Sequence, residues 1–429
     1  MRPVETVSRT IDSYRPVVGD AAVDTLLEAA RPLRGLRVMH VNATPDGGGV
    51  AEILQAAVPL LCDLGLDSSW TVLSAEPEFY DVTKRMHNLL QGADGQLSDL
   101  DRRRWADWQE LNATILPADV DLVVVHDPQP LGLASAAGGG AARWIWRLHI
   151  DTSHPDRDAW RFLRPYLEPY SALVFTLDQF APPDVPDDRV RVIAPAIDPL
   201  DPKNRSLPIG TALSKLAGLG LDARRPLIAQ VARLDPWKDP IGVIDAYRLV
   251  RGRHEGLQLA LLGATEADDD PEAVEVARAV RAHAGKDPDI HVLTDPALIG
   301  DLEVGAVQLL AQVVFQKSLR EGFGLTVSEA MWKSTPVVAG RVGGIPLQLQ
   351  DGQGGFLVDS VEEAAERCDW LLSEPARARA IGAAGRAVIQ ERFLITRLLA
   401  DELTLYREVL ASREQQALRP RPDRLAAAG

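Results

Sequence analysis

The sequence predicts an α/β protein made of two doubly wound domains, each built on a parallel sheet. Short, continuously apolar runs alternate with helical segments along the chain, and this alternation is typical of parallel strands covered by helices on both faces. The chain has 429 residues, which is more than one hydrophobic core usually organises. A segment rich in proline and charge, residues 195–207, divides the strands into two series. We therefore expect a linker there, with one domain on each side.

The first series defines an N-terminal domain over residues 1–200. It opens with an amphipathic helix at residues 21–30, and a β-rich run at residues 36–42 then leads through a glycine turn into a helix at residues 50–64. A strand, a glycine turn and a helix in this order bring backbone amides close to bound phosphate. Further strands are expected at residues 70–73, 121–125, 144–148, 172–176 and 190–194, with a charged helix at residues 100–115.

The second series defines a C-terminal domain over residues 201–392. It opens with a strand at residues 226–232 and a helix at residues 240–251. Further strands are expected at residues 257–263, 290–293, 313–316, 336–339 and 354–358. A last helix follows in residues 393–415, and residues 416–429 are expected to form a disordered tail.

Composition and charge restrict the class of partner. The net charge is −15 and the pI is near 5.1, which argues against nucleic acid or an anionic membrane as a partner. The N-terminus lacks an apolar signal core, and no apolar run is long enough to span a bilayer. Cys62 and Cys368 lie far apart, as expected for reduced thiols in a cytoplasmic protein. No histidines or carboxylates have the spacing of metal ligands, and the acidic run at residues 268–270 is typical of a solvated loop.

One stretch, residues 317–333, carries the strongest indication of function. Glu321 and Glu329 are separated by seven residues, and a turn of Gly322, Phe323 and Gly324 lies between them. The apolar run after the turn predicts the start of a helix, where free backbone amides bind phosphate well. The two carboxylates could then hold a sugar and a ribose with phosphates between them. The alternative interpretation is an ordinary loop followed by a solvated helix face.

Other polar residues also follow predicted strands, at the edge where open α/β sheets bind ligands. They include Gly48 and Gly49 in the first glycine turn, the pair His126 and Asp127, the pair His149 and Asp151, and the pair Arg233 and Lys238. The guanidinium of arginine can donate two parallel hydrogen bonds to phosphate oxygens, and the ammonium group of lysine supplies a compact positive charge, so the two suit a diphosphate. The alternatives are a surface basic pair and structural histidines that are satisfied at strand ends.

These residues resemble those of a known family. Arg233 and Lys238, followed by the Glu-x7-Glu pair, resemble the retaining GT-B glycosyltransferases of family 4. The segments VMHVNATPDGGGVAEIL, VVHDPQPLGL, WRLHIDTSHP, VARLDPWKDP and SLREGFGLTVSEAMWK are similar to the trehalose glycosyltransferring synthases within that family. The resemblance runs from about Val17 to about Leu410. It implies two Rossmann-like domains that face each other across a cleft, and a final helix that returns to the N-terminal domain.

The resemblance also implies a reaction, in which NDP-glucose and glucose reversibly give α,α-trehalose and NDP with retention at the donor carbon. Transfer would occur on the front face, with the leaving diphosphate accepting the proton. No dedicated nucleophile and no obligatory cofactor are implied, although a divalent ion such as Mg²⁺ could accompany the diphosphate. The implied partners are small molecules, namely NDP-glucose, glucose and trehalose, and a homodimer is compatible with the resemblance.

Roles for individual residues follow from the same resemblance. Glu329 would hold the ribose and Glu321 the donor glucose, while His126 would contact the donor sugar near C6. The diphosphate would be bound by Arg233, Lys238, Gly48, Gly49 and the backbone amides of Gly324, Leu325 and Thr326. The acceptor side would be formed by His149, Asp151 and Asp127.

Other functions stay open on the sequence. A trehalose phosphorylase, or a related family 4 enzyme with another acceptor, would share most of these residues. A GT-B-like sugar-nucleotide epimerase would form product from the donor alone, and a silent sugar-nucleotide-binding protein would form none. The nucleotide base of the donor, whether UDP, ADP or GDP, is also left open.

Overall fold

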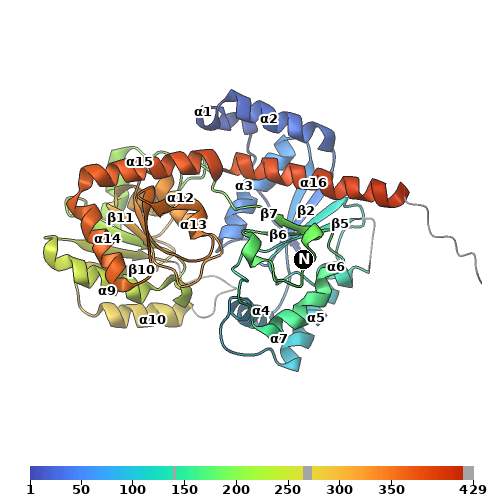
Figure 1. The fold of residues 1–429 in the computed structure, drawn as a ribbon, viewed down its shortest axis with the longest axis horizontal. Coiled ribbons are helices and arrows are strands. Elements are labelled where there is room, and N and C mark those ends of the chain that lie inside the picture. The colour runs from blue at the N-terminus through green and yellow to red at the C-terminus, as the bar shows by residue number, and fades with distance from the viewer. Residues whose placement is uncertain (139–141, 264–272, 419–429) are drawn as a thin grey trace, which may run out of the picture.

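The structure is a computed structural model of the 429-residue chain, and it describes residues 1–138, 142–263 and 273–418. Figure 1 shows two lobes side by side, each with a sheet between layers of helices. The predicted α/β class with two parallel sheets is confirmed. The acidic run at residues 268–270, expected to be a loop, lies outside the described residues.

The N-terminal lobe is built on a sheet with the strand order β1-β3-β2-β4-β5-β6-β7. Its described strands are parallel except β1, a two-residue edge strand that pairs with β3 in the antiparallel direction and that the sequence analysis did not predict. The strands are β1 (Arg2–Pro3), β2 (Arg37–Asn42), β3 (Asp67–Val72), β4 (Leu122–His126), β5 (Arg143–Arg147), β6 (Ala172–Phe175) and β7 (Val190–Val192). The helices are α1 (Arg15–Val18), α2 (Asp20–Ala30), α3 (Gly49–Asp63), α4 (Pro77–Leu90), α5 (Asp99–Ala113), α6 (Leu133–Ala136) and α7 (Arg157–Leu163).

The C-terminal lobe is built on a parallel sheet with the strand order β10-β9-β8-β11-β12-β14-β13. Its central strands are apolar and buried on both faces, as expected for strands between two helix layers. The strands are β8 (Leu227–Val231), β9 (Gln258–Leu262), β10 (Ile290–Leu293), β11 (Val313–Gln316), β12 (Val337–Gly340), β13 (Gln350–Asp351) and β14 (Gly354–Val358). The helices are α8 (Ile209–Gly218), α9 (Pro240–Val250), α10 (Ala273–Ala284), α11 (Asp301–Leu310), α12 (Leu325–Trp332), α13 (Ile345–Gln348), α14 (Val361–Ser373) and α15 (Pro375–Arg392).

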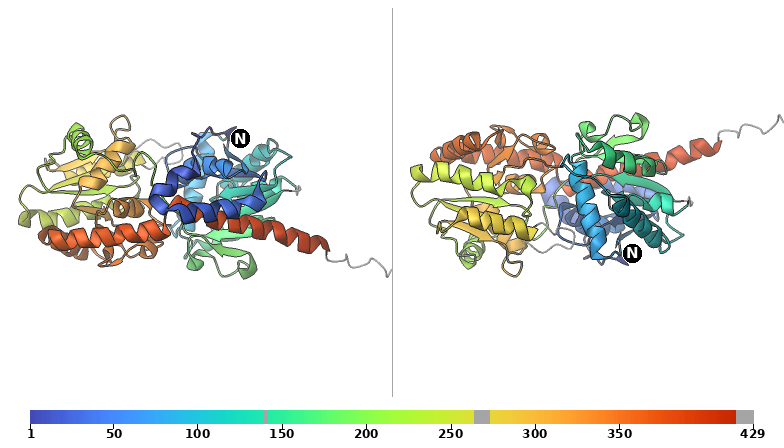
Figure 2. Two further views of the ribbon diagram at one scale, coloured as in Figure 1. Left: turned by 90° about the horizontal axis from the view of Figure 1, so that it is seen from above. Right: turned by 90° about the horizontal axis from the view of Figure 1, so that it is seen from below.

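The chain crosses between the lobes twice, and the two crossings lie side by side. The Ile197 amide donates to the Phe393 carbonyl at 2.9 Å, and the Ile395 amide donates to the Ile197 carbonyl at 2.9 Å. Helix α16 (Ile395–Leu418) then packs against α2 and α3 of the N-terminal lobe, as both views of Figure 2 show. Because the crossings are hydrogen-bonded to each other, they form one two-stranded connection between the lobes.

Helix α16 is longer than the sequence analysis expected, and it is anchored by charge. Residues 416–418, assigned above to the disordered tail, form its last turn, while residues 419–429 lie outside the described residues. The guanidinium of Arg147, at the end of β5, pairs with the carboxylate of Glu402, and both side chains are buried. Arg397 also donates to the carbonyls of Ala194 and Pro195 at 2.8 Å. The returning helix is therefore tied both to the first sheet and to the linker.

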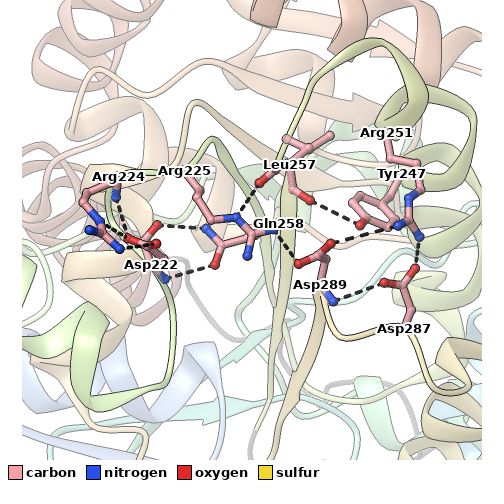
Figure 3. Close-up of polar contacts among 10 residues, drawn as sticks. Asp222, Arg224, Arg225, Tyr247, Arg251, Leu257, Gln258, Asp287 and Asp289 are labelled. Atoms are coloured by element: carbon pink, nitrogen blue, oxygen red, sulfur yellow. Dashed lines mark hydrogen bonds and ion pairs between the residues drawn. The ribbon is translucent and has the colours of Figure 1, made fainter.

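A polar network closes the amino-terminal edge of the second sheet (Figure 3). Arg225 pairs with Asp289 at 2.5 Å, and the hydroxyl of Tyr247 donates to the Leu257 carbonyl at 3.2 Å. The pKa of Tyr247 is raised to about 12, mainly by burial and to a smaller extent by the nearby Asp287 carboxylate. Ligands of open α/β sheets bind at the opposite, carboxyl-terminal edge, so this network stabilises the lobe and leaves that edge to the site.

None of the described helices is both long enough and apolar enough to cross a lipid bilayer.

Candidate active site

A cleft of about 470 Å³ is lined by residues of both lobes. It collects residues at the carboxyl-terminal edges of both sheets, where the sequence analysis expected ligands. The predicted site residues that line it are Gly48, Gly49, His126, Asp127, His149, Arg233, Lys238, Glu321, Gly322, Phe323, Gly324, Leu325, Thr326 and Glu329. Asp151 is not among the lining residues.

Two helices begin at the cleft, one from each lobe. Helix α3 starts at Gly49 and helix α12 starts at Leu325, and both residues line the cleft. Gly324 precedes α12 with φ of +83°, a left-handed conformation that glycine adopts without strain. A Cβ on Gly322 would lie 1.9 Å from the His149 carbonyl oxygen, so only glycine lets the turn approach the other lobe this closely. The glycines therefore direct two positive helix ends toward one space, which suits an anion.

Glu321 is held from one side. Its Oε2 atom accepts hydrogen bonds from Lys238 Nζ at 2.7 Å, Gln316 Nε2 at 2.9 Å and Ser318 Oγ at 3.0 Å. The residue is only 7% exposed, and its hydrogen bonds to other described side chains all go to Oε2. The carboxylate is thus fixed through one oxygen, and Oε1 can accept hydrogen bonds from a ligand.

Glu329, on α12, is part of a buried network between the lobes. Its Oε1 atom lies 2.8 Å from Lys203 Nζ, and its Oε2 atom accepts from Gln308 Nε2 at 2.9 Å. Lys203 also contacts Glu52 of α3 at 2.7 Å. Burial opposes the charge of Glu329, but Lys203 and Lys333 outweigh it and hold its pKa below the usual range. The carboxylate is therefore ionised and an acceptor of hydrogen bonds at neutral pH.

Cationic side chains gather opposite Glu321. Arg233 and Lys238 follow β8, and Lys84 of α4 adds a third cation from the other lobe. Lys84 Nζ lies 3.2 Å from Asp235 Oδ2, and both side chains are buried. Burial would raise the pKa of Asp235, but Lys84 and other cations hold it below the usual range. His87 lines the same wall, and burial together with the charges of Lys84 and Arg233 lowers its pKa to about 3.

Three histidines form a hydrogen-bonded chain that ends at the cleft. His40 Nδ1 lies 3.1 Å from His126 Nε2, and His126 Nδ1 lies 3.0 Å from His149 Nε2. Both ring nitrogens of His126 are therefore used, and the residue is 1% exposed. His126 was expected to contact the donor sugar. It lines the cleft together with His149, but both of its ring nitrogens already contact other histidines. Asp127 fixes the loop, since its Oδ1 accepts from the His149 amide at 2.8 Å.

Asp151 stabilises the loop behind the site. Its Oδ1 atom accepts from the amide and the hydroxyl of Ser153 at 2.9 and 2.6 Å, and its Oδ2 atom lies 3.8 Å from Arg320. Arg320 itself lines the cleft. Asp151 therefore reaches the cleft through Arg320. Across the described residues, no group of three or more His, Cys, Asp or Glu side chains is arranged to hold a metal ion.

Two family models and several known proteins match most of this chain. The family described as "Trehalose synthase, N-terminal domain" matches residues 40–182, and the family "Glycosyl transferases group 1" matches residues 215–388. A trehalose synthase from Rubrobacter xylanophilus is 46% identical over 407 residues, covering 94% of this chain and 97% of that protein. The chain belongs to the trehalose synthase family of glycosyltransferases.

More distant similarities fit this placement. A trehalose phosphorylase from Pleurotus sajor-caju is 29% identical over 418 residues, covering 83% of this chain and 55% of that protein. A solved α,α-trehalose 6-phosphate synthase from Burkholderia multivorans superimposes with a TM-score of 0.68 at 18% identity, covering 89% of this chain and all of that one. At this identity the likeness concerns the fold, and it confirms the expected GT-B architecture.

Several residues in the cleft of this trehalose synthase family member were not found from the sequence. Lys84 and His87 lie on α4, a helix that the sequence analysis did not single out, and Lys203 lies in the segment interpreted as a linker. The sequence offered one indication for Lys203, its positive charge in the predicted linker shortly before the first strand of the second domain. Its partners Glu52 and Glu329 could not be inferred, because they are distant in sequence and meet only when the two lobes pack together.

Proposed function

We propose that this chain is a retaining glycosyltransferase that forms α,α-trehalose from NDP-glucose and D-glucose, and that also catalyses the reverse reaction. The observation that carries the proposal is a single cleft in which two anchored carboxylates, Glu321 and Glu329, lie with a cluster of cations and two helix N-termini. Anion sites and hydroxyl acceptors in one cleft suit a sugar nucleotide. Membership of the trehalose synthase family supports trehalose as the product.

The donor would lie between the two lobes. Its diphosphate would bind to Arg233 and Lys238 and to the backbone amides at the start of α3 and α12. Glu329 is ionised and would accept hydrogen bonds from the ribose hydroxyls. Glu321 is fixed through Oε2, so its Oε1 would accept from hydroxyls of the donor glucose.

The reaction would need no carboxylate nucleophile. The bond between the glucose C1 and the diphosphate oxygen breaks, and its electron pair stays on the diphosphate. The acceptor hydroxyl oxygen bonds to C1 on the same face, and its proton passes to that diphosphate oxygen. Configuration is retained because the attack and the departure occur on one face, unlike in glycosidases that form a covalent intermediate. Arg233 and Lys238 would stabilise the charge that develops on the leaving group.

The acceptor would be held on the N-terminal side of the cleft. We assign a substrate hydrogen bond to His149, which was expected on the acceptor side. We assign none to His126, which was expected at the donor sugar, because both of its ring nitrogens bind other histidines. Asp127 and Arg320 would complete this side, with Asp151 orienting Arg320. The cationic side chains supply the charge that the diphosphate requires, so we propose no obligatory cofactor. A divalent ion such as Mg²⁺ would enter with the donor.

The experiment is to incubate the purified protein with UDP-, ADP- or GDP-glucose and glucose, and to analyse the disaccharide and its anomeric linkage by NMR. Formation of α,α-trehalose from one or more donors is expected, and formation of NDP-glucose from trehalose and NDP is expected in reverse. Phosphate-dependent breakdown of trehalose would indicate a phosphorylase, the activity of the Pleurotus relative. Product from the donor alone would indicate an epimerase, and no turnover would contradict the proposal.

A further inference from the structure

The histidine chain crosses three neighbouring strands of the first sheet. His40 lies on β2, His126 ends β4, and His149 follows β5. In the sheet register, His40 is opposite Val124 and His126 is opposite Arg147. Each histidine is therefore two residues further toward the carboxyl edge than its neighbour. The rings stack with interplanar angles of 28° and 18°, and the row leads from the buried sheet to the cleft.

The tautomer of one histidine ring determines the tautomer of the next ring. Burial first, and then the charge of Arg147, lowers the pKa of both His40 and His149, and the pKa of His126 is also lowered by burial and by its neighbours. The three rings are thus neutral at pH 7, and each has one N–H group and one bare nitrogen. Two contacts between ring nitrogens can be satisfied only if both N–H groups point the same way along the row. Either His149 Nδ1 carries a proton at the cleft end, or His40 Nε2 carries one at the buried end.

The buried end decides between these two states. His40 Nε2 is fully buried and has no hydrogen-bond partner among the described residues. A proton on it would be an unsatisfied donor near the positive charge of Arg147, whose Nη2 is likewise a buried donor without a partner among those residues. A lone pair on the same nitrogen is stabilised by that charge. The favoured state therefore leaves His40 Nε2 bare and directs every N–H toward the cleft.

We propose that His40 and His126 are positioning residues that hold His149 as its neutral Nδ1–H tautomer, so that His149 donates a hydrogen bond to a substrate oxygen. His149 Nδ1 makes no hydrogen bond within the described part of the chain and is not fully buried, and His149 lines the cleft. A neutral donor there can bind a sugar or phosphate oxygen without adding charge. The nature of that substrate rests on the proposed function, whereas the tautomer does not.

The test is long-range ¹H–¹⁵N NMR of the full-length protein labelled with ¹⁵N-histidine, with the His149 signal assigned from a His149→Asn sample. The Nδ1–H pattern is expected for His149 in the wild type. His40→Asp presents only acceptor oxygens to His126 Nε2, so it should reverse the row and turn His149 toward the Nε2–H form. His40→Asn, which has nearly the same shape and whose amide N–H can replace Nδ1–H, should retain the wild-type pattern. His291→Leu, on β10 of the other lobe, is the matched control and should leave the His149 signal unchanged.

Kinetics provide a second measurement. His40→Asp should lower kcat about tenfold, the effect of one misdirected hydrogen bond, while calorimetry shows unchanged NDP affinity and His40→Asn retains most of kcat. An Nε2–H pattern for His149 in the wild type would overturn the proposal even if the variants fail to fold. An unchanged tautomer in a folded His40→Asp variant would also overturn it. Absence of trehalose synthesis in the wild type would refute the proposed function and leave the NMR result as an independent test.

Discussion

Replacing Lys203 by methionine should destabilise the protein through one carboxylate. Lys203 Nζ lies 2.8 Å from Glu329 and 2.7 Å from Glu52. Methionine keeps most of the apolar stem but removes the ammonium group. The Glu329 side chain is 4% exposed, whereas that of Glu52 is 46% exposed. Burial raises the pKa of Glu52, but water still reaches its half-exposed side chain. Most of the cost should therefore come from the uncompensated charge on Glu329.

The magnitude follows from that burial. Removing one partner of a buried ion pair costs about 3–5 kcal/mol. The cost here should be near the lower end, about 3 kcal/mol, because Lys333 remains close to Glu329 and its charge also lowers the Glu329 pKa. Burial lowers the pKa of Lys333 only to about 8, so Lys333 is still mostly protonated at pH 7. For a domain of about 200 residues, the melting temperature should fall by roughly 6–12 °C.

The pH dependence separates lost charge from lost packing. In the wild type the pKa of Glu329 is lowered, so its contribution to stability is present above the unfolded pKa of about 4.3 and is lost as the pH falls through the folded value. In the variant, burial without Lys203 should raise the Glu329 pKa, and the destabilisation should then grow as the pH rises above about 4.3. The difference in melting temperature should thus be largest near pH 7 and shrink toward pH 4.3. A packing defect would give a difference that does not change with pH.

Scanning calorimetry of the wild type, Lys203→Met and Glu52→Gln at pH 7 and pH 5 tests this reasoning. Glu52→Gln is the matched control, because it breaks the more exposed contact of the same lysine and should cost about 1 kcal/mol or less. Calorimetry is suitable because a two-lobed chain need not unfold in a single step. A melting temperature of Lys203→Met within about 1 °C of the wild type at pH 7 would refute the assignment, and so would a deficit that is equal at both pH values.

Three further predictions concern the cleft and the returning helix. Lys238→Ala should lower kcat/KM by about two orders of magnitude through loss of a charge partner of the transition state, and steady-state kinetics near the wild-type value would argue against this role. Glu321→Gln should mainly lower kcat, whereas Glu329→Gln should mainly raise the donor KM and weaken NDP binding measured by calorimetry; the reverse pattern would exchange their roles. Glu402→Gln should leave Arg147 buried without its carboxylate and destabilise the protein by about 3–5 kcal/mol in thermal melts, and an unchanged melt would show that this pair does not anchor α16.

The strands and the residues at their ends could be predicted because their signals are local. An apolar run such as residues 121–125 is buried wherever it folds, and a charged residue directly after it must lie at the carboxyl edge of a parallel sheet. Arg233, Lys238 and Glu321 could be placed at this edge in that way, and the helix predicted after the glycine turn placed Glu329 near them. This reasoning did not find β1, whose two exposed residues pair with β3.

The partners of those residues could not be read from the sequence. Lys84 and Asp235 are 151 positions apart, and nothing in the α4 sequence distinguishes a lysine that meets the other lobe from one in solvent. His126 illustrates the limit within a single motif, because its place after a strand correctly indicated the site but not what its two nitrogens bind. His40, 86 positions earlier, takes one of them.

The sequence by itself thus determined the two-sheet architecture, the family, and the edge at which chemistry can occur, since hydrophobic periodicity and strand ends are properties of neighbouring residues. Only the tertiary structure decided that Lys203 joins Glu52 to Glu329, that Lys84 reaches Asp235, and that three histidine rings are hydrogen-bonded in a row. Such contacts depend on sheet register and on how the lobes pack. The register and the packing of the lobes depend on how much apolar surface is buried over the whole chain, so no short segment determines them.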